Sequence, residues 1–556
     1  MLLLQLLKGV KGVVEKKNIR VLAFDVGTTG IKTCLYDISD RVTLIASALH
    51  SYGLTVLPDG GAEQNPEEWW EALRKSTSDV LASCAVKPGE IRGISFCSQM
   101  QGLVLVDRDG KALRPAMSYM DQRAREELRQ GMQRGLKIGG LNALRTLRAL
   151  RVTGAVAGSV KDPVWKYLWV KNHEPEVFAR VYKWLDVKEY LICRMTGRFI
   201  MTQDSAFATE LFDIRPGRMC FSPAICRMYG VDPAHLPEII SSSDVAGPLL
   251  PGIAHELGLE PGTPVFGGGG DAALIGVGAG ATAPGATHVY SGTSGWVGTA
   301  IDHSVVDISS MMAAIVGAEP GLFVYFAELE TAGKCLEWVR DHLALDEINI
   351  YLEKKVVTDS IEKKYTSLYD YLSLIISEIP AGSNGVIFTP WLHGNRMPFE
   401  DPNARGMFFN ISLETGKTEL IRSVVEGVCF HLRWFLETQE RKVKTSNPIR
   451  FVGGGALSAV TCQILADCTG RCVETVADPQ NVGAVGAALV AAKGVGFMQS
   501  IRDAGAFVHA EGRYQPNPKN KAAYDRNYDV FIKLYKSNCE HFAALNGATK
   551  ERRKEV

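Results

Sequence analysis

A short segment near the start of the chain has the pattern D-x-G-T-T-x-x-K, formed by Asp25, Gly27, Thr28, Thr29 and Lys32. Apolar runs on both sides predict a strand, a tight turn and a second strand over 19–37. A turn of glycine and threonines presents backbone N–H groups and hydroxyls, which suit a terminal phosphate. The neighbouring carboxylate can hold Mg²⁺ through water, because Mg²⁺ prefers a few carboxylates together with phosphate oxygens. An ordinary structural turn is the alternative, and the lysine in the second strand is compatible with either.

A second turn of the same kind lies in SGTSG, at Ser291–Gly295. A third glycine-rich segment, GGGA at Gly453–Ala456, lies between a predicted strand and a predicted helix. Two matching turns that face each other would grip the phosphates of a nucleotide, and the third segment would let backbone approach the nucleoside or its phosphates. The chain has neither a G-x-x-x-x-G-K-[ST] loop nor a G-x-G-x-x-G that opens a βαβ unit with a downstream acid, so a P-loop and a dinucleotide fold are both unsupported.

Asp271 follows a predicted strand and four glycines in the segment GGGGDAA. The glycines leave room for a ligand in front of the carboxylate. Such a carboxylate can take the proton from an alcohol while the alcohol oxygen attacks a γ-phosphorus. The structural alternative is an aspartate that caps the helix after it.

The elements that must position these residues recur in both halves of the chain. Strand–turn–strand segments are expected at 19–37 and 91–107 in the first half, and at 285–300 in the second half, which opens near Thr263. This repetition indicates a duplicated domain. Helices are expected at 65–84, 161–200 (ended by Gly197), 420–439, within 449–470, at 481–496, in a charged surface insertion at 346–375, and in a polar, solvated tail from Asn520.

The composition sets the class of protein. A chain of 556 residues is too long for one ordinary core, so two or more large domains are expected. Apolar residues make up 46% and charged residues 22%, which excludes a disordered chain, a collagen-like repeat and a long coiled coil. The 61 basic and 61 acidic residues balance, so no net charge draws the chain to nucleic acid or to an anionic membrane.

The cysteines and the first residues of the chain bear on where in the cell the protein is found. The 12 cysteines are scattered without zinc-ligand spacing, which favours free thiols in a reducing cytoplasm. No apolar run reaches the roughly 20 residues needed to cross a bilayer. Residues 1–18 are apolar but lack the basic start and cleavage site of a secretory signal, and they are set aside from the fold. A cytoplasmic protein with small-molecule partners, no nucleic acid and no membrane is expected.

The ordered set of motifs resembles the FGGY family of carbohydrate kinases, and within it the xylulose kinases most closely. The resemblance runs from about Arg20 to Gly496. No single motif is decisive, but the set in this order is highly specific. The segments that carry it are DVGTTGIK, EQNPEEWW, SQMQG, LRPAMSYMDQRA, GGGGDAA, YSGTSGW, PWLHGNRMPFEDPNARG, FVGGGALS and NVGAVGAA.

The resemblance implies an α/β fold of two actin-like (ribonuclease-H-like) domains, with the active site in the cleft between them. The expected division is an N-terminal extension at 1–18, a sugar-binding domain at 19–275, a nucleotide-binding domain at 276–500 and a C-terminal helical tail at 501–556. The family also suggests a homodimer.

The resemblance implies a role for each site residue. Asp271 is expected to be the catalytic base, and Asp25 and Asp271 the carboxylates associated with Mg²⁺. The sugar is expected to contact Gln99, Met100, Gln101, Asp121 and Asp271. The residues expected around ATP are Gly27, Thr28, Thr29, Lys32, Gly292, Thr293, Ser294, Gly454, Gly455, Ala456 and Asn481.

Two positions depart from the pattern of the xylulose kinases. Gln101 stands where a histidine is usual, and it can still offer a donor and an acceptor to a sugar hydroxyl. Tyr119 stands where the family often has tryptophan, so one wall of the sugar pocket differs.

The implied activity is transfer of phosphate from ATP, with Mg²⁺, to a sugar hydroxyl, first of all from D-xylulose to D-xylulose 5-phosphate. Other pentuloses, pentitols and tetritols remain open as substrates. An actin-like ATPase without a sugar substrate and a regulatory member without turnover are the alternatives of another class. Glycerol is disfavoured, because the Arg-Glu pair of the glycerol kinases is absent at Met100 and Gln101.

Overall fold

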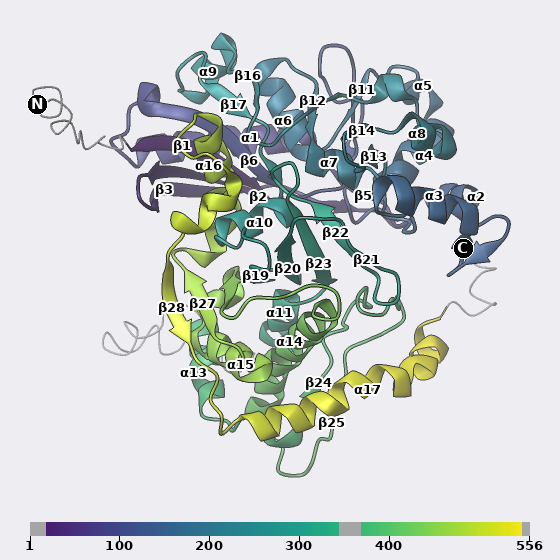
Figure 1. Ribbon diagram of the computed structural model, residues 1–556, viewed down its shortest axis with the longest axis vertical. Helices are drawn as coiled ribbons and strands as arrows, with labels where there is room; N and C mark the ends of the chain where they lie inside the picture. Colours follow the sequence, from purple (N-terminus) through teal and green to yellow (C-terminus); the bar gives the residue numbers. More distant parts are fainter. Residues whose placement is uncertain (1–17, 344–367, 548–556) are drawn as a thin grey trace, which may run out of the picture.

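The computed structural model describes residues 18–343 and 368–547. All but the last residue of the predicted N-terminal extension, and most of the predicted charged insertion, lie outside the described residues. Two mixed β-sheets, one from each half of the chain, form the frame of the molecule (Figure 1).

The N-terminal sheet is built around the first predicted hairpin. Strands β1 and β2 pair antiparallel, β3 continues on the outside, and β6 lies parallel to β1 on the other side. The short strand β18 also pairs with β6. The strand order is β3–β2–β1–β6–β17–β16, with bounds β1 Ile19–Val26, β2 Gly30–Ile38, β3 Val42–Ser51, β6 Ile91–Ser98, β16 Val245–Pro248, β17 Pro264–Phe266 and β18 Gly269–Gly270.

The C-terminal sheet repeats this order of strands and extends it by β22 and β21 outside β23. β19 and β20 form the hairpin, β23 lies outside β20, and β26 and β27 run parallel to β19. The antiparallel strand β28 closes that edge as β16 does in the first sheet. The predicted duplication is therefore confirmed. The bounds are β19 Thr287–Ser291, β20 Gly295–Ile301, β21 Val306–Asp307, β22 Met312–Val316, β23 Phe323–Leu329, β26 Ile449–Val452, β27 Val473–Val476 and β28 Ala510–Tyr514.

Two helices join the halves. α10 (Asp271–Gly278) follows the last strands of the first sheet, and α16 (Val482–Gly494) follows β27 but packs against β1 and β6 of the other sheet. Their backbones touch: a Cβ on Gly278 or on Gly486 would collide with a carbonyl of the opposite helix. The small residues predicted at 481–496 thus allow a close helix crossing between the two sheets (Figure 1).

The helices around the sheets largely follow their sequence signals. α1 (Pro66–Ala82) begins with a proline, and the side chain of Asn65 accepts the N–H of Glu67. α14 (Lys417–Gln439) and α15 (Ala459–Thr469) match the predicted helices, and α11 (Gly333–His342) and α13 (Leu368–Ser377) lie in the same half. The segment 161–200 differs, because strand β11 interrupts it to pair with β7. Gly197 ends α6 with a φ of 71°, as predicted.

A separate hydrophobic core lies beside the N-terminal sheet, and we call the region around it the side lobe. Its centre contains the fully buried rings of Trp165, Tyr167 and Trp184. The elements of this lobe and its borders are β4 Thr55–Val56, β5 Ala62–Gln64, β7 Val104–Val106, β8 Ala116–Met117, α2 Arg125–Met132, β9 Lys137–Ile138, β10 Leu141–Asn142, α3 Ala143–Thr153, α4 Pro163–His173, α5 Pro175–Phe178, β11 Lys183–Leu185, α6 Val187–Thr196, β12 Ile200–Thr202, α7 Gln203–Ala208, β13 Phe212–Asp213, β14 Cys220–Phe221, α8 Pro223–Tyr229, β15 Glu238–Ile240 and α9 Pro251–Leu257.

The C-terminal region is more integrated than expected. β28 completes the second sheet, and α17 (Lys521–Asn546) buries Tyr524 and Phe531 against Phe430 of α14, and Phe542 against Trp391. The expectation of a solvated tail helix was wrong, because these aromatic residues form an apolar stripe that the polar composition concealed. Within the described ranges, no helix is both long and apolar enough to span a bilayer.

Candidate active site

Asp25 lies on β1 and Asp271 directly follows β18, and these two strands flank β6 at the junction of the two halves. Asp25 is the penultimate residue of β1 and pairs with Cys97 of β6. Cys97 pairs on its other side with Gly269 of β18, and Asp271 opens α10 directly after β18. The parallel register therefore brings both carboxylates to the same edge of the sheet, although 245 positions separate them (271 minus 25, less one).

The surroundings of Asp271 weaken its acidity. Burial raises the pKa of the carboxyl to about 7, the N–H of Ala272 opposes this with a 2.8 Å hydrogen bond, and the negative charge of Asp25 adds to the rise. Burial also raises the pKa of Asp25, against the positive charge of Lys32 and a hydrogen bond from Cys97. A carboxyl that titrates near neutral pH can accept a proton and release it again, which is the property of a general base.

The first glycine–threonine turn is held from several sides. The N–H of Gly27 donates to the carbonyl of Gly30 at 2.9 Å, and the hydroxyl of Tyr52 donates to the carbonyl of Gly27. Thr28 Oγ1 lies 3.3 Å from the hydroxyl of Tyr119, while Thr29 is exposed. The turn thus has the predicted position at the end of β1, and it contacts the loop that carries Tyr119.

Lys32 and Asn481 bind each other. Lys32 Nζ donates to Asn481 Oδ1 at 2.7 Å and to the carbonyl of Gln480 at 3.2 Å. Lys32 belongs to β2 and Asn481 immediately precedes α16, so the bond joins the two halves of the chain. The neighbouring Gly483 lies against Asp25, since a Cβ there would be 2.8 Å from Asp25 Oδ2. Contacts of Lys32 and Asn481 with the nucleotide stay a prediction. In the structure, the two residues bind each other and so link the two domains.

The second turn and the GGGA segment meet, as a common binding surface requires. The N–H of Gly292 donates to the carbonyl of Ser294 at 2.9 Å, and Thr293 is exposed. A Cβ on Gly453 would lie 2.5 Å from the carbonyl oxygen of Ser291, and one on Gly455 would lie 2.8 Å from its Oγ. Open space surrounds the Cα of Gly454, while Ala456 is buried.

The loop after β6 carries three of the predicted sugar contacts. The Gln99 amide nitrogen donates to Gln64 at 2.9 Å, whereas Gln99 Oε1 is buried with no donor among the described residues. Met100 packs against Gly270, where any side chain would collide with its sulfur. Gln101 has a φ of 61°, which is uncommon for a residue other than glycine. The loop therefore lies beside the residue that precedes Asp271.

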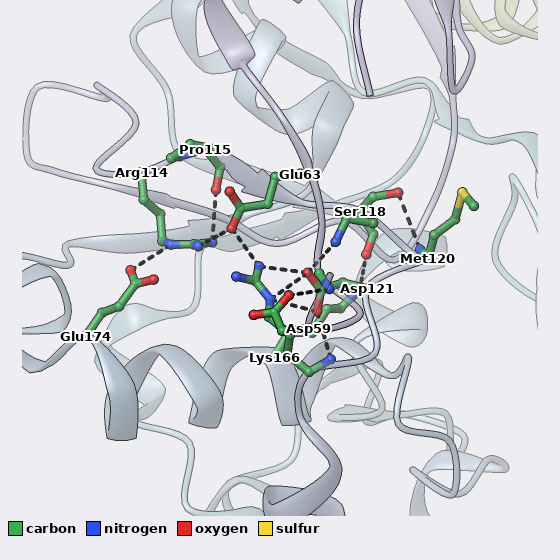
Figure 2. Close-up of polar contacts among 12 residues, drawn as sticks. Asp59, Glu63, Arg114, Pro115, Ser118, Met120, Asp121, Lys166 and Glu174 are labelled. Atoms are coloured by element: carbon green, nitrogen blue, oxygen red, sulfur yellow. Dashed lines mark hydrogen bonds and ion pairs between the residues drawn. The ribbon is translucent and has the colours of Figure 1, made fainter. Parts of the chain in front are cut away.

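Asp121 is fully buried and committed to protein donors. Its carboxylate accepts the N–H of Ala62 at 2.9 Å, and the guanidinium and N–H of Arg123. Arg123 also pairs with Glu63. Glu63 in turn binds Arg114 (Figure 2). Asp121 therefore anchors the loop that carries Tyr119. Its contact with the sugar stays a prediction.

Three buried charged residues near the site belong to no motif that the sequence analysis recognised. Asp204 Oδ2 accepts the N–H of Gly270 at 2.6 Å, directly before Asp271. Asp186 Oδ1 accepts the N–H of Gly102 at 2.8 Å, and Lys166 Nζ donates to the carbonyl of Gln101 at 2.6 Å. Charged residues inside helical segments are usually solvated, so their types and spacing offered no signal that they turn inward.

The comparisons with known proteins agree with this geometry. The models described as the N-terminal and C-terminal domains of the FGGY family of carbohydrate kinases match residues 20–278 and 288–495. The xylulose kinase of Bacillus subtilis is 29% identical over 536 residues, which are 96% of this chain and 99% of that protein. A gluconokinase of the same organism is 26% identical and covers 92% of this chain and 95% of its own length.

Solved structures extend the likeness to the whole fold. A ligand-bound xylulose kinase from Lactobacillus acidophilus has a TM-score of 0.80 at 26% identity, and the match covers 95% of this chain and 99% of that chain. A gluconate kinase from Lactobacillus acidophilus has a TM-score of 0.79 at 25% identity, with 95% and 100% covered.

The repeated sheets and the paired carboxylates at their junction define a two-domain sugar kinase fold of the actin-like type. The chain belongs to the FGGY family of carbohydrate kinases. Both the family and the fold class expected from the sequence are thereby confirmed. The predicted division between 275 and 276 falls inside α10, and a division after that helix respects both the helix and the ranges matched.

Proposed function

We propose that this enzyme transfers the γ-phosphoryl group of ATP to a hydroxyl of D-xylulose and forms D-xylulose 5-phosphate. The observation that carries the proposal is the position of Asp271: a carboxyl with a pKa of about 7, at the first residue of α10, across β6 from Asp25 and directly after Gly270, against which Met100 packs. The full-length similarity to proteins named xylulose kinase supports the choice of sugar.

The proposed reaction is an in-line displacement. The ionised carboxylate of Asp271 accepts the proton of the sugar hydroxyl as that oxygen bonds to the γ-phosphorus and the bond to the β-γ bridging oxygen breaks. The turns at 27–29 and 292–294 would bind the phosphates through N–H groups and hydroxyls. Holding sugar and nucleotide in line accounts for most of the rate in such reactions.

Mg²⁺ fits the residues at this junction. Asp25 and Asp271 would hold it together with phosphate oxygens, and Mg²⁺ would neutralise charge on the phosphates. Its usual ligand set, one or two carboxylates with water and phosphate, agrees with a pair of carboxylates rather than a closed cage. The described residues contain no group of three or more His, Cys, Asp and Glu side chains that could form such a cage.

Gluconate is the second candidate substrate, because gluconokinases also match nearly the whole chain. The charges with the largest effect on the pKa of Asp271 are those of Asp25, Glu328 and Asp186, and all three are negative. A neutral pentulose fits this field better than the carboxylate of gluconate. D-xylulose is therefore preferred.

The test is a substrate panel with the purified chain and MgATP. D-xylulose, D-ribulose, xylitol, erythritol, gluconate and glycerol are compared by kcat/KM from ADP formation, with the phosphorylated product confirmed by mass spectrometry. We expect D-xylulose to exceed the other substrates by at least about tenfold. ADP formation independent of any sugar would instead indicate an actin-like ATPase, and preference for gluconate would overturn the proposed substrate.

We also propose that the enzyme works in the cytoplasm and forms homodimers. All 12 cysteines are free thiols, which suits a reducing compartment. Light scattering of the purified chain measures the oligomeric state, and a monomer at working concentration contradicts the dimer.

A further inference from the structure

Lys166 is a fully buried lysine of α4, in the side lobe, and its ammonium group binds two backbone carbonyls. Nζ donates to the carbonyl oxygen of Gln101 at 2.6 Å and to that of Ser118 at 3.0 Å. Figure 2 shows Lys166 rising from its helix toward the loop that carries Ser118 and Asp121. Burying an ammonium group is costly, so lysines are rarely enclosed without a specific arrangement of partners.

The two carbonyls belong to the two loops that carry the predicted sugar contacts. Gln101 follows Gln99 and Met100 after β6, and Ser118 precedes Tyr119, whose hydroxyl lies 3.3 Å from Thr28 Oγ1. One ammonium group therefore sets the spacing between the Met100–Gln101 loop and the Tyr119 loop. These are also the places where the sequence departs from the xylulose kinase pattern.

The peptide bond between Gln101 and Gly102 is held at both of its polar atoms. Lys166 Nζ binds its carbonyl oxygen, and Asp186 Oδ1 accepts its N–H at 2.8 Å. The C=O and N–H of a trans peptide point in opposite directions, so the lysine and the aspartate grip the peptide plane from two sides. Gly102 leaves room for this contact, because a Cβ there would lie 2.6 Å from Asp186 Oδ1.

These two hydrogen bonds explain the unusual backbone conformation of Gln101. A φ of 61° is disfavoured for glutamine and persists only where surrounding contacts hold it. Fixing the following peptide plane restricts ψ of Gln101 and so restrains the backbone from which its side chain projects. Burial lowers the pKa of Lys166 to about 8, and the carboxylates of Asp121, Asp186 and Asp162 oppose this lowering, so the ammonium group is mostly charged at neutral pH.

We propose that Lys166 is a positioning residue for the sugar: with Asp186 it clamps the Gln101–Gly102 peptide and ties it to the Ser118–Tyr119 wall, so that both walls are preformed before the sugar binds. The inference rests on the proposed function. It assigns Lys166 no contact with ATP and no part in proton transfer.

The test is a series at position 166 that first changes the shape of the cationic donor, then removes the charge, and finally removes all donors: Lys166→Arg, Lys166→Gln and Lys166→Met. We expect KM for the preferred sugar to rise in that order, by about 3-fold for arginine and by 10-fold or more for methionine, while KM for ATP stays within about twofold. Partial rescue by arginine relative to methionine separates positioning from simple loss of packing. Any member of the series that folds gives a comparison with the wild type.

Lys183→Met is the matched control. Lys183 Nζ also donates to two backbone carbonyls, those of Ala234 and Leu236, each at 2.8 Å, but these lie in another loop of the same lobe. The control should lose thermal stability without a change in sugar KM.

Two results would overturn the clamp. One is a series whose folded members all keep the wild-type sugar KM; the other is a parallel rise in the KM values for sugar and ATP. Both require an active wild-type enzyme, so they are distinct from failure of the proposed function, in which the wild type phosphorylates no sugar of the panel.

Discussion

Lys32 of the first sheet and Asn481 at the start of α16 form a 2.7 Å hydrogen bond across the two halves of the chain. The donor is charged, and it also binds the carbonyl of Gln480 at 3.2 Å. The bond places α16 over the end of β1, where Gly483 lies against Asp25. It therefore links the nucleotide-side helix to the carboxylate that the sequence associates with Mg²⁺.

The first prediction concerns this bond. Lys32→Met should lower the free energy of unfolding by about 1–3 kcal/mol, since it leaves Asn481 Oδ1 and the Gln480 carbonyl without their donor. Denaturant unfolding and KM for ATP are the measurements. A variant of wild-type stability that is impaired only in ATP binding would show that Lys32 serves the nucleotide instead.

Asp271→Asn should fold, bind ATP and lose about 10²–10⁴-fold in kcat, the usual contribution of a general base. The amide has nearly the shape of the carboxylate but cannot accept the proton. Asp302→Asn, at an exposed position beside His303, is the matched control and should retain full activity. Near-normal turnover of Asp271→Asn would remove Asp271 from the chemistry.

The pH dependence of activity follows from the pKa of about 7 at Asp271. The base must be ionised, so kcat/KM should fall about tenfold per pH unit below pH 7 and level off above pH 8. A profile that stays flat from pH 5 to pH 8 would contradict this assignment.

The free energy of unfolding should depend on pH in the opposite direction to activity, and fall as pH rises. The pKa of Asp271 is raised from 3.8 in the folded state, so its contribution to stability is fully present below about pH 4 and is lost as pH rises toward 7. Asp271→Asn removes this titration. The unfolding free energy of that variant relative to the wild type should therefore increase between pH 4 and pH 7 and then remain constant, as measured by denaturant unfolding at each pH. A difference that does not vary with pH would rule out the raised pKa.

Asp204 should position Asp271 by holding the backbone of the residue before it, Gly270. Its Oδ2 accepts the N–H of Gly270 at 2.6 Å, and its Oδ1 is buried without a partner among the described residues. Asp204→Leu should lower kcat by about 10–100-fold, because small displacements of a catalytic group are costly. The KM values for sugar and ATP should change little. Equal losses in kcat and in ATP affinity would indicate general disruption of the fold.

Gly483 should be intolerant of any side chain. A Cβ would lie 2.8 Å from Asp25 Oδ2 and 3.0 Å from Cys97 Sγ. Gly483→Ala should cost about 1–3 kcal/mol of stability through overpacking and should reduce kcat by displacing Asp25. Gly252→Ala in α9, where the added methyl meets no atom within 4 Å, is the control and should be neutral or slightly stabilising. Equal stability of the two variants would show that α16 can move away from Asp25.

Local patterns in the sequence were sufficient for the repeated hairpins, the helix expected at 65–84, the helix end at Gly197, and the small-residue helix at 481–496. Each depends on residue types within a few positions: turn residues between apolar runs, a cap, or glycine and alanine at helical spacing. The tail helix at 521–546 was misjudged because a charged, polar composition masked its apolar stripe.

The sequence by itself determined the duplicated α/β architecture, the glycine-rich turns and the candidate base at Asp271, since these follow from short-range chemistry and from the order of motifs. Only the tertiary structure decided which charged groups are already engaged: Lys32 with Asn481, Asp121 with the N–H of Ala62, and Lys166 with the carbonyl of Gln101. The physical reason is that partners such as Lys32 and Asn481 lie hundreds of residues apart. Only strand register and helix packing bring them within hydrogen-bonding distance, and no local periodicity encodes that approach.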